Sequence, residues 1–372
     1  MIFRQIRSKD DTGTLTYLVA DENTKEAVVI DPNIEDLERI LFTADELGLR
    51  IKYVIDTHTH ADHITAAGEI KNLTRSEVIM HVNTKDKWKV VDEGDKFGIG
   101  DILRANASVE VDRYVNDGDT IKAGSLELKV LFTPGHTDNH ISLLLKDMLF
   151  TGDLLLVGQA GRSDLPGGNP SEQYDSLFNK VLILPGNIKI FPGHDYEENE
   201  YSVLSDEKMD NPFLRPRTKE EYIEFVRDFF PPFAEASKEG KMTLQCGTKR
   251  VSTSDLPFEN ISPEELAGMI NNREDLFLMD VREPFELMAF GAVPGVVNIP
   301  TSEITRRLNE IPRGGGRKVV VICQSGNRSF EVSHYLAKHG FSGILNLESG
   351  TSGWMQSRNP RVNELKFSGT RK

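Results

Sequence analysis

Three imidazoles and one carboxylate lie within the stretch Thr57-His58-Thr59-His60-Ala61-Asp62-His63. This stretch follows the apolar run 51–55, which we predict to be a buried strand that ends at Asp56. Imidazole and carboxylate ligands suit zinc, iron or manganese rather than calcium or magnesium. A single histidine there would more often be a hydrogen-bonded core or surface residue, but the spacing H-x-H-x-D-H is rare by chance. The stretch therefore predicts a metal site at the end of a strand.

Three later segments place further ligand types in glycine-containing turns. They are His136 in Thr133-Pro134-Gly135-His136-Thr137, Asp153 in Phe150-Thr151-Gly152-Asp153, and His194 in Phe191-Pro192-Gly193-His194-Asp195-Tyr196. Each alone would be interpreted as a turn residue. Their order and spacing together resemble the metallo-β-lactamase superfamily, and this resemblance implies an α/β fold of the αββα sandwich type.

Within that superfamily, residues 1–247 resemble the persulfide dioxygenases, which are also called sulfur dioxygenases. The resemblance is carried by Thr14-Leu15-Thr16-Tyr17-Leu18, Gly161-Arg162-Ser163-Asp164-Leu165, Gly193-His194-Asp195-Tyr196 and Cys246-Gly247. In the third string, Asp195 stands where glyoxalase II relatives typically carry Glu. The resemblance implies one Fe(II) in this half of the chain, held by His58, His136 and Asp153.

The same resemblance implies roles for the other polar residues of the site. The residues that it places around the pocket, without a second metal ion, are His60, Asp62, His63 and His194. Arg162 and Tyr196 match positions that hold the glutathione part of the substrate. For Arg162 a surface salt bridge is the alternative, although a guanidinium does suit a carboxylate-bearing substrate.

Two histidines and one carboxylate on one face of an iron leave positions open for O₂ and a persulfide. The resemblance implies that glutathione persulfide, or the persulfide of another small thiol, is oxidised to sulfite and free thiol. Zinc lacks redox states and could only activate water. The alternative is therefore a binuclear zinc thioester hydrolase of the glyoxalase II type, with a second metal at Asp62, His63 and His194.

One segment departs from the superfamily pattern. After Thr137 the chain continues Asp138-Asn139-His140, where relatives usually carry Gly at the second position and a small residue at the third. His140 could approach the metal, but a structural histidine with satisfied hydrogen bonds is the favoured interpretation.

The last third of the chain reads as a second α/β unit. We predict a helix over 263–271 with Ser262 as N-cap and Glu265 at the capping-box position, and a strand over 276–280. A strand over 318–322 is followed by the loop 323–328 and a helix over 329–339 closed by Gly340. This order puts the thiol of Cys323 near a helix N-terminus, where backbone N–H groups and the helix dipole stabilise a thiolate.

The strings around that loop resemble the rhodanese family over residues 259 to about 358. They are Asp280-Val281-Arg282-Glu283, the segment 291–300 (GAVPGVVNIP) and the segment 347–354 (LESGTSGW). Cys323 is then the sulfur-transfer nucleophile, Gln324, Ser325, Gly326 and Asn327 form the persulfide loop, and Arg328 contacts an anion. Asp280 and Arg282 are expected to form a structural ion pair. A buried inert cysteine, or a non-catalytic binding module, is the alternative.

Length and composition agree with two soluble units. The chain has 372 residues, of which 38% are hydrophobic and 27% charged. We expect a metallo-β-lactamase-fold domain over 1–247, a linker over 248–258, a rhodanese domain with a central parallel sheet over 259–363 and a tail over 364–372.

Charge and hydropathy restrict the partners. The net charge of −14 disfavours nucleic acid, and neither a signal-peptide pattern nor a membrane-spanning apolar run is seen, so we expect a cytoplasmic protein. The expected partners are a thiol persulfide, O₂ and thiosulfate or sulfite. The thiol carrier, the direction of the sulfur-transfer step and the size of a homo-oligomer, dimer or larger, stay open.

Overall fold

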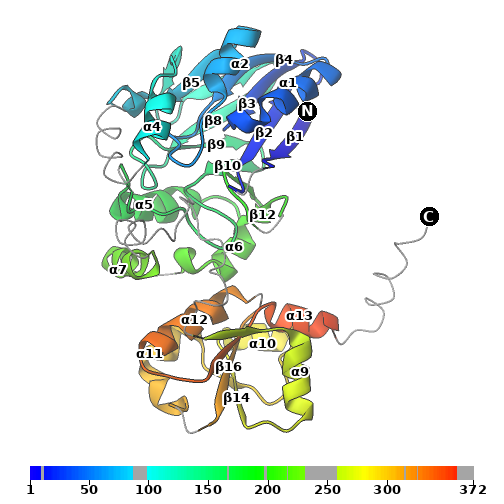
Figure 1. Ribbon diagram of the computed structural model, residues 1–372, viewed down its shortest axis with the longest axis vertical. Coiled ribbons are helices and arrows are strands. Elements are labelled where there is room, and N and C mark those ends of the chain that lie inside the picture. The colour runs from blue at the N-terminus through cyan, green and yellow to red at the C-terminus, as the bar shows by residue number, and fades with distance from the viewer. Residues whose placement is uncertain are drawn as a thin grey trace, which may run out of the picture. The chain divides into compact units, whose positions relative to one another are not determined.

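The computed structural model describes residues 1–9, 12–86, 99–165, 167–196, 199–215, 217–230, 258–313, 316–324 and 326–357. Most of the expected linker over 248–258, the expected tail over 364–372, Cys246 and Ser325 lie outside these residues. The chain divides into two compact units, one of residues 1–209 and 213–249 and one of residues 250–372 with 210–212 (Figure 1). None of the helices within the described residues is long and apolar enough to cross a membrane.

The first unit contains two six-stranded sheets. The first sheet has the order β1-β2-β3-β4-β5-β6, with β1 (Ile2–Arg7), β2 (Leu15–Ala20), β3 (Glu26–Ile30), β4 (Arg50–Ile55), β5 (Glu77–His81) and β6 (Arg113–Val115). Strands β2 and β3 form the antiparallel hairpin that the β-branched residues on either side of the turn at 21–25 favour, and β3 to β6 are parallel.

The second sheet has the order β12-β11-β10-β9-β8-β7. Its strands are β7 (Thr120–Ala123), β8 (Leu126–Phe132), β9 (Ile141–Leu145), β10 (Met148–Gly152), β11 (Lys189–Pro192) and β12 (Ser202–Val203). Strands β10 and β11 are parallel, so their carboxyl ends lie at the same edge of the sheet.

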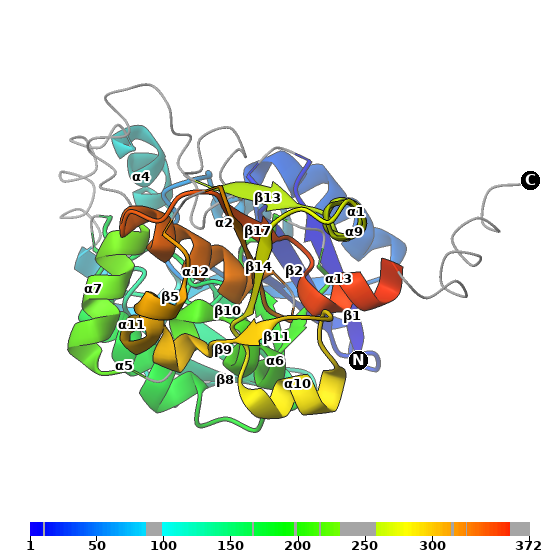
Figure 2. The ribbon, with the colours of Figure 1, turned by 90° about the horizontal axis from the view of Figure 1, so that it is seen from below.

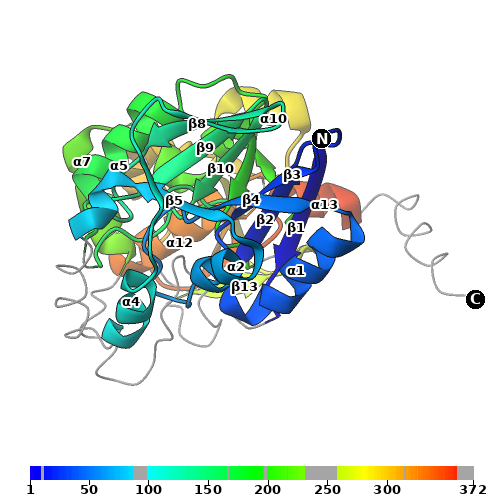
Figure 3. The ribbon, with the colours of Figure 1, turned by 90° about the horizontal axis from the view of Figure 1, so that it is seen from above.

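Helices cover the outer face of each sheet. Helix α1 (Leu37–Glu46) and helix α2 (Ala67–Thr74) pack on the first sheet through a cluster that includes Ile40 and Ile70 (Figure 3). Helix α5 (Pro170–Ser176), its continuation η4 (Leu177–Val181) and helix α7 (Lys219–Phe229) pack on the second sheet. The remaining helices of this unit are η1 (Ile34–Asp36), η2 (Val82–Asp86), α4 (Gly100–Ala107), α6 (Leu204–Asp210) and η5 (Pro212–Leu214).

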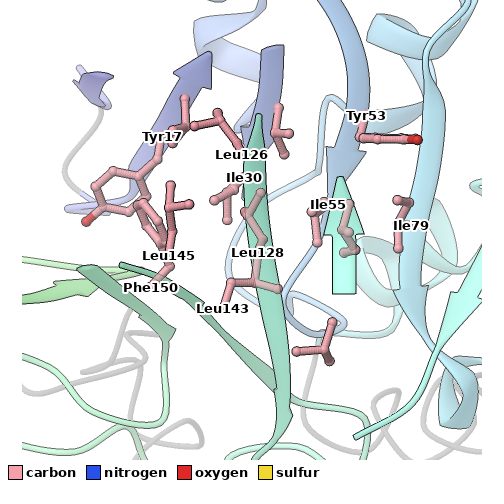
Figure 4. Close-up of a cluster of buried hydrophobic side chains, with 14 of the residues drawn as sticks. Tyr17, Ile30, Tyr53, Ile55, Ile79, Leu126, Leu128, Leu143, Leu145 and Phe150 are labelled. Atoms are coloured by element: carbon pink, nitrogen blue, oxygen red, sulfur yellow. The ribbon is translucent and has the colours of Figure 1, made fainter. Parts of the chain in front are cut away.

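The main core lies between the two sheets. Alternate side chains of both sheets fill it, among them Tyr17, Ile30, Leu128, Leu143 and Phe150 (Figure 4). The αββα sandwich predicted from the sequence is therefore confirmed. Its layering matters for function because β4, β8, β10 and β11 each end immediately before a segment that carries a predicted site residue.

The second unit has one five-stranded parallel sheet of order β13-β17-β16-β14-β15. Its strands are β13 (Glu259–Ile261), β14 (Leu276–Asp280), β15 (Val297–Asn298), β16 (Lys318–Ile322) and β17 (Ile344–Leu347). Helices α11 (Ile304–Arg307) and α12 (Asn327–Lys338) pack on one face, and α9 (Pro263–Asn271) and α13 (Gly350–Ser357) pack on the other (Figure 2). Helix α10 (Pro284–Phe290) and the turns η7 (Thr301–Glu303) and η8 (Leu308–Glu310) complete the unit.

The predicted elements of this unit are largely confirmed. Helix α9 has the predicted bounds, and its capping box between Ser262 and Glu265 is present. Strands β14 and β16 also match. Helix α12 begins at Asn327, two residues earlier than predicted, so Arg328 belongs to the first helical turn rather than to a loop.

Candidate metal centre and thiol loop

Three residues from distant parts of the first unit converge at one edge of the sandwich. His58 follows β4, His136 lies in the loop between β8 and β9, and Asp153 follows β10. The Nε2 atoms of His58 and His136 lie 3.6 Å and 3.7 Å from Oδ2 of Asp153. All three side chains are buried, and their ligand atoms lie within 4.8 Å of one another.

The atoms that face one another in this triad fit a metal ion. Nε2 of His58 and Oδ2 of Asp153 are buried and have no hydrogen-bond partner among the described residues. The other ring nitrogens are held: Nδ1 of His58 lies 2.9 Å from the Thr57 hydroxyl, and Nδ1 of His136 lies 2.7 Å from the Arg162 carbonyl. Histidine ligands of metals are typically oriented through their second nitrogen in this way. Buried polar atoms without a partner are costly, and a bound cation would satisfy them.

The protonation states also suit a ligand set. Burial lowers the pKa of His58 and of His136, which keeps their lone pairs available. Burial would raise the pKa of Asp153, but the neighbouring His194 outweighs it and holds this pKa well below its usual value. The triad is therefore two neutral imidazoles and one carboxylate.

His194 bridges two carboxylates. Its Nδ1 lies 2.7 Å from Oδ1 of Asp153, and its Nε2 lies 2.8 Å from Oδ2 of Asp62. Burial would lower the pKa of His194, but the two carboxylates raise it well above its usual value. Nδ1 of His63 lies 2.9 Å from the same oxygen of Asp62. In this arrangement both ring nitrogens of His194 are occupied by carboxylate oxygens.

His60 lies beside the triad but faces other groups. Its ring packs edge-on against His58 with centroids 4.2 Å apart, and its Nε2 lies 3.4 Å from Oδ1 of Asp31. Burial would lower the pKa of His60, but Asp31 and Asp56 raise it to about 9. The ligand atoms of His60, Asp62 and His63 also lie within 4.8 Å of one another. Ligands for a second cation are thus present beside the triad.

Residues 139 and 140 are both buried and hydrogen-bonded. Nδ1 of His140 lies 3.0 Å from the Thr133 hydroxyl, and its Nε2 accepts the N–H of Asp153 at 3.2 Å. Burial lowers the pKa of His140 to about 3, so the ring is neutral. Both nitrogens have partners, which agrees with the structural interpretation of this histidine.

Arg162 and Tyr196 each contact a histidine of the site, and their role in holding a thiol carrier stays a prediction. Arg162 is buried, and its guanidinium donates two hydrogen bonds to the Asp164 carboxylate at 2.8 Å and 2.7 Å. A salt bridge of Arg162, the alternative considered from the sequence, is therefore present, with a buried guanidinium and a partly exposed carboxylate. The Tyr196 ring stacks on His194 with centroids 6.2 Å apart. The Asp195 carboxylate accepts hydrogen bonds from Asn199 of the same loop and from Arg7 of β1.

In the second unit, Cys323 is buried at the end of β16. Its Sγ accepts hydrogen bonds from the N–H of Gly326 at 3.1 Å and from the hydroxyl of Ser329 at 3.4 Å. Gly326 has φ +102°, and a β-carbon there would collide with the carbonyl oxygen of Glu348, so only glycine fits. The loop therefore directs one backbone donor, the N–H of Gly326, at the sulfur.

The charged residues around this loop are paired. Arg282 forms the expected ion pair with Asp280 at 2.8 Å and also donates to Oε1 of Gln324 at 2.6 Å. Arg328 donates two hydrogen bonds of 2.7 Å to the Glu286 carboxylate. Nε of Arg328 is buried without a hydrogen-bond partner among the described residues. Anion contact by Arg328 stays a prediction, with that atom as the available donor.

Sequence reasoning missed three residues that hold these sites. Ser329 and Glu286 contact the thiol loop, and Asp31 contacts the histidine segment through Thr57 and His60. A signal existed for Asp31, which ends an apolar strand as Asp56 does. Glu286 gave none, because its partner Arg328 is 42 residues away.

Two family comparisons agree with the two units. Residues 10–194 match the metallo-beta-lactamase superfamily, and residues 262–357 match the rhodanese-like domain. The chain therefore belongs to the metallo-β-lactamase superfamily and carries a C-terminal rhodanese-like domain. The chain is an enzyme, and its homologues include the persulfide dioxygenase ETHE1.

The individual relatives show how far the likeness extends. The bovine protein "Persulfide dioxygenase ETHE1, mitochondrial" is 35% identical over 203 residues, which are 54% of this chain and 71% of the relative. A hydroxyacylglutathione hydrolase of Nitrosococcus oceani is 34% identical over 215 residues, 57% of this chain and 73% of the relative.

Two solved structures are similar to this chain. ETHE1 from Myxococcus xanthus is 36% identical and has a TM-score of 0.54, covering 65% of this chain and all of its own. A metallo-β-lactamase from Staphylococcus aureus has the same TM-score and covers 93% of this chain and 99% of its own. At 24% identity, this second likeness shows the fold alone.

Proposed function

We propose that the first unit oxidises a small-thiol persulfide with O₂ at one ferrous ion held by His58, His136 and Asp153. The balanced reaction is RSSH + O₂ + H₂O giving RSH, sulfite and two protons. The observation that carries the proposal is the position of two imidazole Nε2 atoms, of His58 and His136, at 3.6 Å and 3.7 Å from Oδ2 of Asp153. The likeness to ETHE1 proteins at 35% identity supports the same assignment.

The surrounding residues have distinct parts in this reaction. A ferrous ion at the triad would supply the redox chemistry that activates O₂ and would leave positions open beside three protein ligands. His194 donates to Oδ1 of Asp153 and so orients Oδ2 toward the two imidazoles. Both nitrogens of His194 contact carboxylate oxygens, one of Asp153 and one of Asp62. Arg162 and Tyr196 would contact the thiol carrier, for which glutathione is the first candidate.

The second unit would move sulfane sulfur through Cys323. The thiolate attacks the outer sulfur of thiosulfate, the S–S bond of the donor breaks, and sulfite leaves with the electron pair of that bond. A small thiolate then attacks the outer sulfur of the Cys323 persulfide, which regenerates the Cys323 thiolate. The sum is RSH + S₂O₃²⁻ giving RSSH + SO₃²⁻, and it is reversible. The donors to Sγ from Gly326 and Ser329 support this assignment because they stabilise the anionic sulfur.

A thioester hydrolase is the second candidate for the first unit. The hydroxyacylglutathione hydrolase at 34% identity favours it, and so do two ligand groups beside the triad, which together include Asp62, His63 and His194. This function would need a second metal ion, which would supply activation of a water molecule for hydrolysis.

Metal content and oxygen uptake separate the two candidates. Protein purified without oxygen should contain one iron per chain, and it should consume one O₂ per glutathione persulfide and release one sulfite. His136→Ala should lose the iron and lower the oxidation rate at least about a hundredfold, since a ligand is removed. The exposed His339 of the second unit provides the matched control, because His339→Ala should keep both the iron content and the oxidation rate of the wild type. Two zinc ions per chain with thioester hydrolysis and no oxygen uptake would contradict the proposal.

Coenzyme A and bacillithiol persulfides in the same assay identify the thiol carrier.

A further inference from the structure

The buried carboxamide of Asn139 forms hydrogen bonds with three threonines from separate segments. Its Oδ1 accepts the N–H of Thr59 at 3.3 Å and the hydroxyl of Thr137 at 2.8 Å. Its Nδ2 donates to the hydroxyls of Thr59 at 2.7 Å and of Thr84 at 3.1 Å. A carboxamide has two acceptor positions and two donor hydrogens, so Asn139 makes its full complement of hydrogen bonds.

Two of these threonines immediately follow triad histidines in the chain. Thr59 follows His58, and Thr137 follows His136. The same side chain therefore joins the segment after β4 to the segment after β8, one residue away from each imidazole. The third contact, Thr84, lies in η2 and adds the segment after β5.

We propose that Asn139 is a positioning residue that fixes the separation between His58 and His136, and thereby the affinity of the triad for its metal ion. The proposal rests on the assignment of the triad under the proposed function, but not on which reaction the metal ion serves. A glycine at this position would leave the hydroxyls of Thr59, Thr84 and Thr137 without this partner. The two loops would then be joined only by the contacts around them, and the imidazoles would be less well ordered before the metal binds.

The next residue extends the same connection to the third member of the triad. Nε2 of His140 accepts the N–H of Asp153, and the His140 ring stacks on His58 with centroids 5.2 Å apart. Residues 139 and 140 together therefore touch the segments of all three triad members. This pair is also the part of the sequence that departs from the superfamily pattern.

The test measures metal binding on the full-length chain without substrate. Fe(II), Co(II) and Zn(II) are titrated into metal-free wild type, Asn139→Gly and Asn139→Leu, in which leucine keeps the size of the side chain. We expect both variants to bind each ion about tenfold to a hundredfold more weakly, the range typical for residues that orient ligands. The visible spectrum of the Co(II) protein should also change, because it reports the arrangement of the ligands.

Two further variants separate positioning from general destabilisation. Ile40→Ala removes core volume from α1 and should lower the melting temperature while it leaves the metal affinity unchanged within about twofold. Thr137→Val removes one hydroxyl contact, and its effect on metal affinity should be less than additive with Asn139→Gly, since both act through one carboxamide.

The inference is overturned if the folded Asn139 variants bind all three ions within twofold of wild type. It is equally overturned if Ile40→Ala loses as much affinity at the same loss of stability. Should a glycine variant fail to fold, Thr137→Val alone decides, with the same twofold limit. The assay contains no persulfide and no thioester, so failure of the proposed oxidation leaves this result interpretable.

Discussion

At the scale of single residues, the environment of each group sets its chemical form. Burial lowers the pKa of His58 and His136, whereas two carboxylates raise that of His194. Chemically identical side chains within one site therefore become two neutral imidazoles and one cation. The first pair can bind a metal ion, and the third orients a carboxylate.

The thiol of Cys323 gives the clearest prediction at this scale. Cys323→Ser should abolish sulfur transfer from thiosulfate to glutathione, since an alcohol cannot carry the sulfane sulfur as a persulfide. Oxidation of added glutathione persulfide should continue at the wild-type rate. Sulfite release from thiosulfate and glutathione without oxygen, and oxygen uptake with added glutathione persulfide, measure the two activities separately. Unchanged sulfur transfer in the variant would make the second unit a binding module.

At the scale of elements, strand ends and helix starts bring the reactive groups together. Strands β4, β10 and β11 end before His58, Asp153 and His194, and β16 ends before Cys323. The N–H groups of Thr351 and Ser352 at the start of α13 donate to the carbonyls of Cys323 and Gln324. Backbone groups at the start of α13 thus hold the segment that carries Cys323.

The ion pair between Glu286 of α10 and Arg328 of α12 predicts acid sensitivity of the second unit. Burial would raise the pKa of Glu286, but the hydrogen bonds from Arg328 and from the Glu283 N–H outweigh it, so this pKa lies below its ordinary value of 4.5. The stabilisation by the carboxylate is therefore complete above about pH 4.5 and is lost as the pH falls through the lower folded-state value. Glu286→Gln should lose stability on the order of 2 kcal/mol at pH 7, since Arg328 keeps its ion pair with Asp210, and the stability of the variant should depend less on acid.

Urea unfolding tests this prediction through the fluorescence of Trp354, which is buried in the second unit. A Trp88→Phe background removes the other tryptophan of the chain. The free energy of unfolding is compared between pH 7 and pH 4, both with Glu286 and with Glu286→Gln. The difference between the two proteins isolates the contribution of this carboxylate. Equal acid dependence in both proteins would show that other carboxylates govern it.

At the scale of the whole molecule, the chain is two compact units with separate cores. Metal removal should therefore destabilise only the first unit, because only its triad would bind the ion. A ligand present at about one hundred times its dissociation constant stabilises by about 2.7 kcal/mol, so chelation should lower the first unfolding transition by several degrees. Scanning calorimetry with and without chelator measures both transitions. A parallel shift of the second transition would contradict independent units.

The fold was predictable where the pattern is local. Apolar runs indicated strands β4, β14 and β16, and Ser262 with Glu265 indicated the start of α9. The residue pattern predicts the start of helix α12 two residues too late. Gly326 adopts a left-handed conformation, and the helix begins directly after it. Such a boundary depends on backbone geometry that residue types alone do not fix.

By itself, the sequence determined the types of ligand, their order along the chain and the position of the reactive thiol, because these are properties of short segments. Only the tertiary structure decided which nitrogen of each histidine faces the triad, that Glu286 pairs with Arg328, and that Asn139 joins the two histidine segments. The direction of a buried side chain depends on partners that are tens of residues away and is set when the layers pack. For this reason, the contacts that orient the site were found in the fold, even where the motifs already contained the residues that make them.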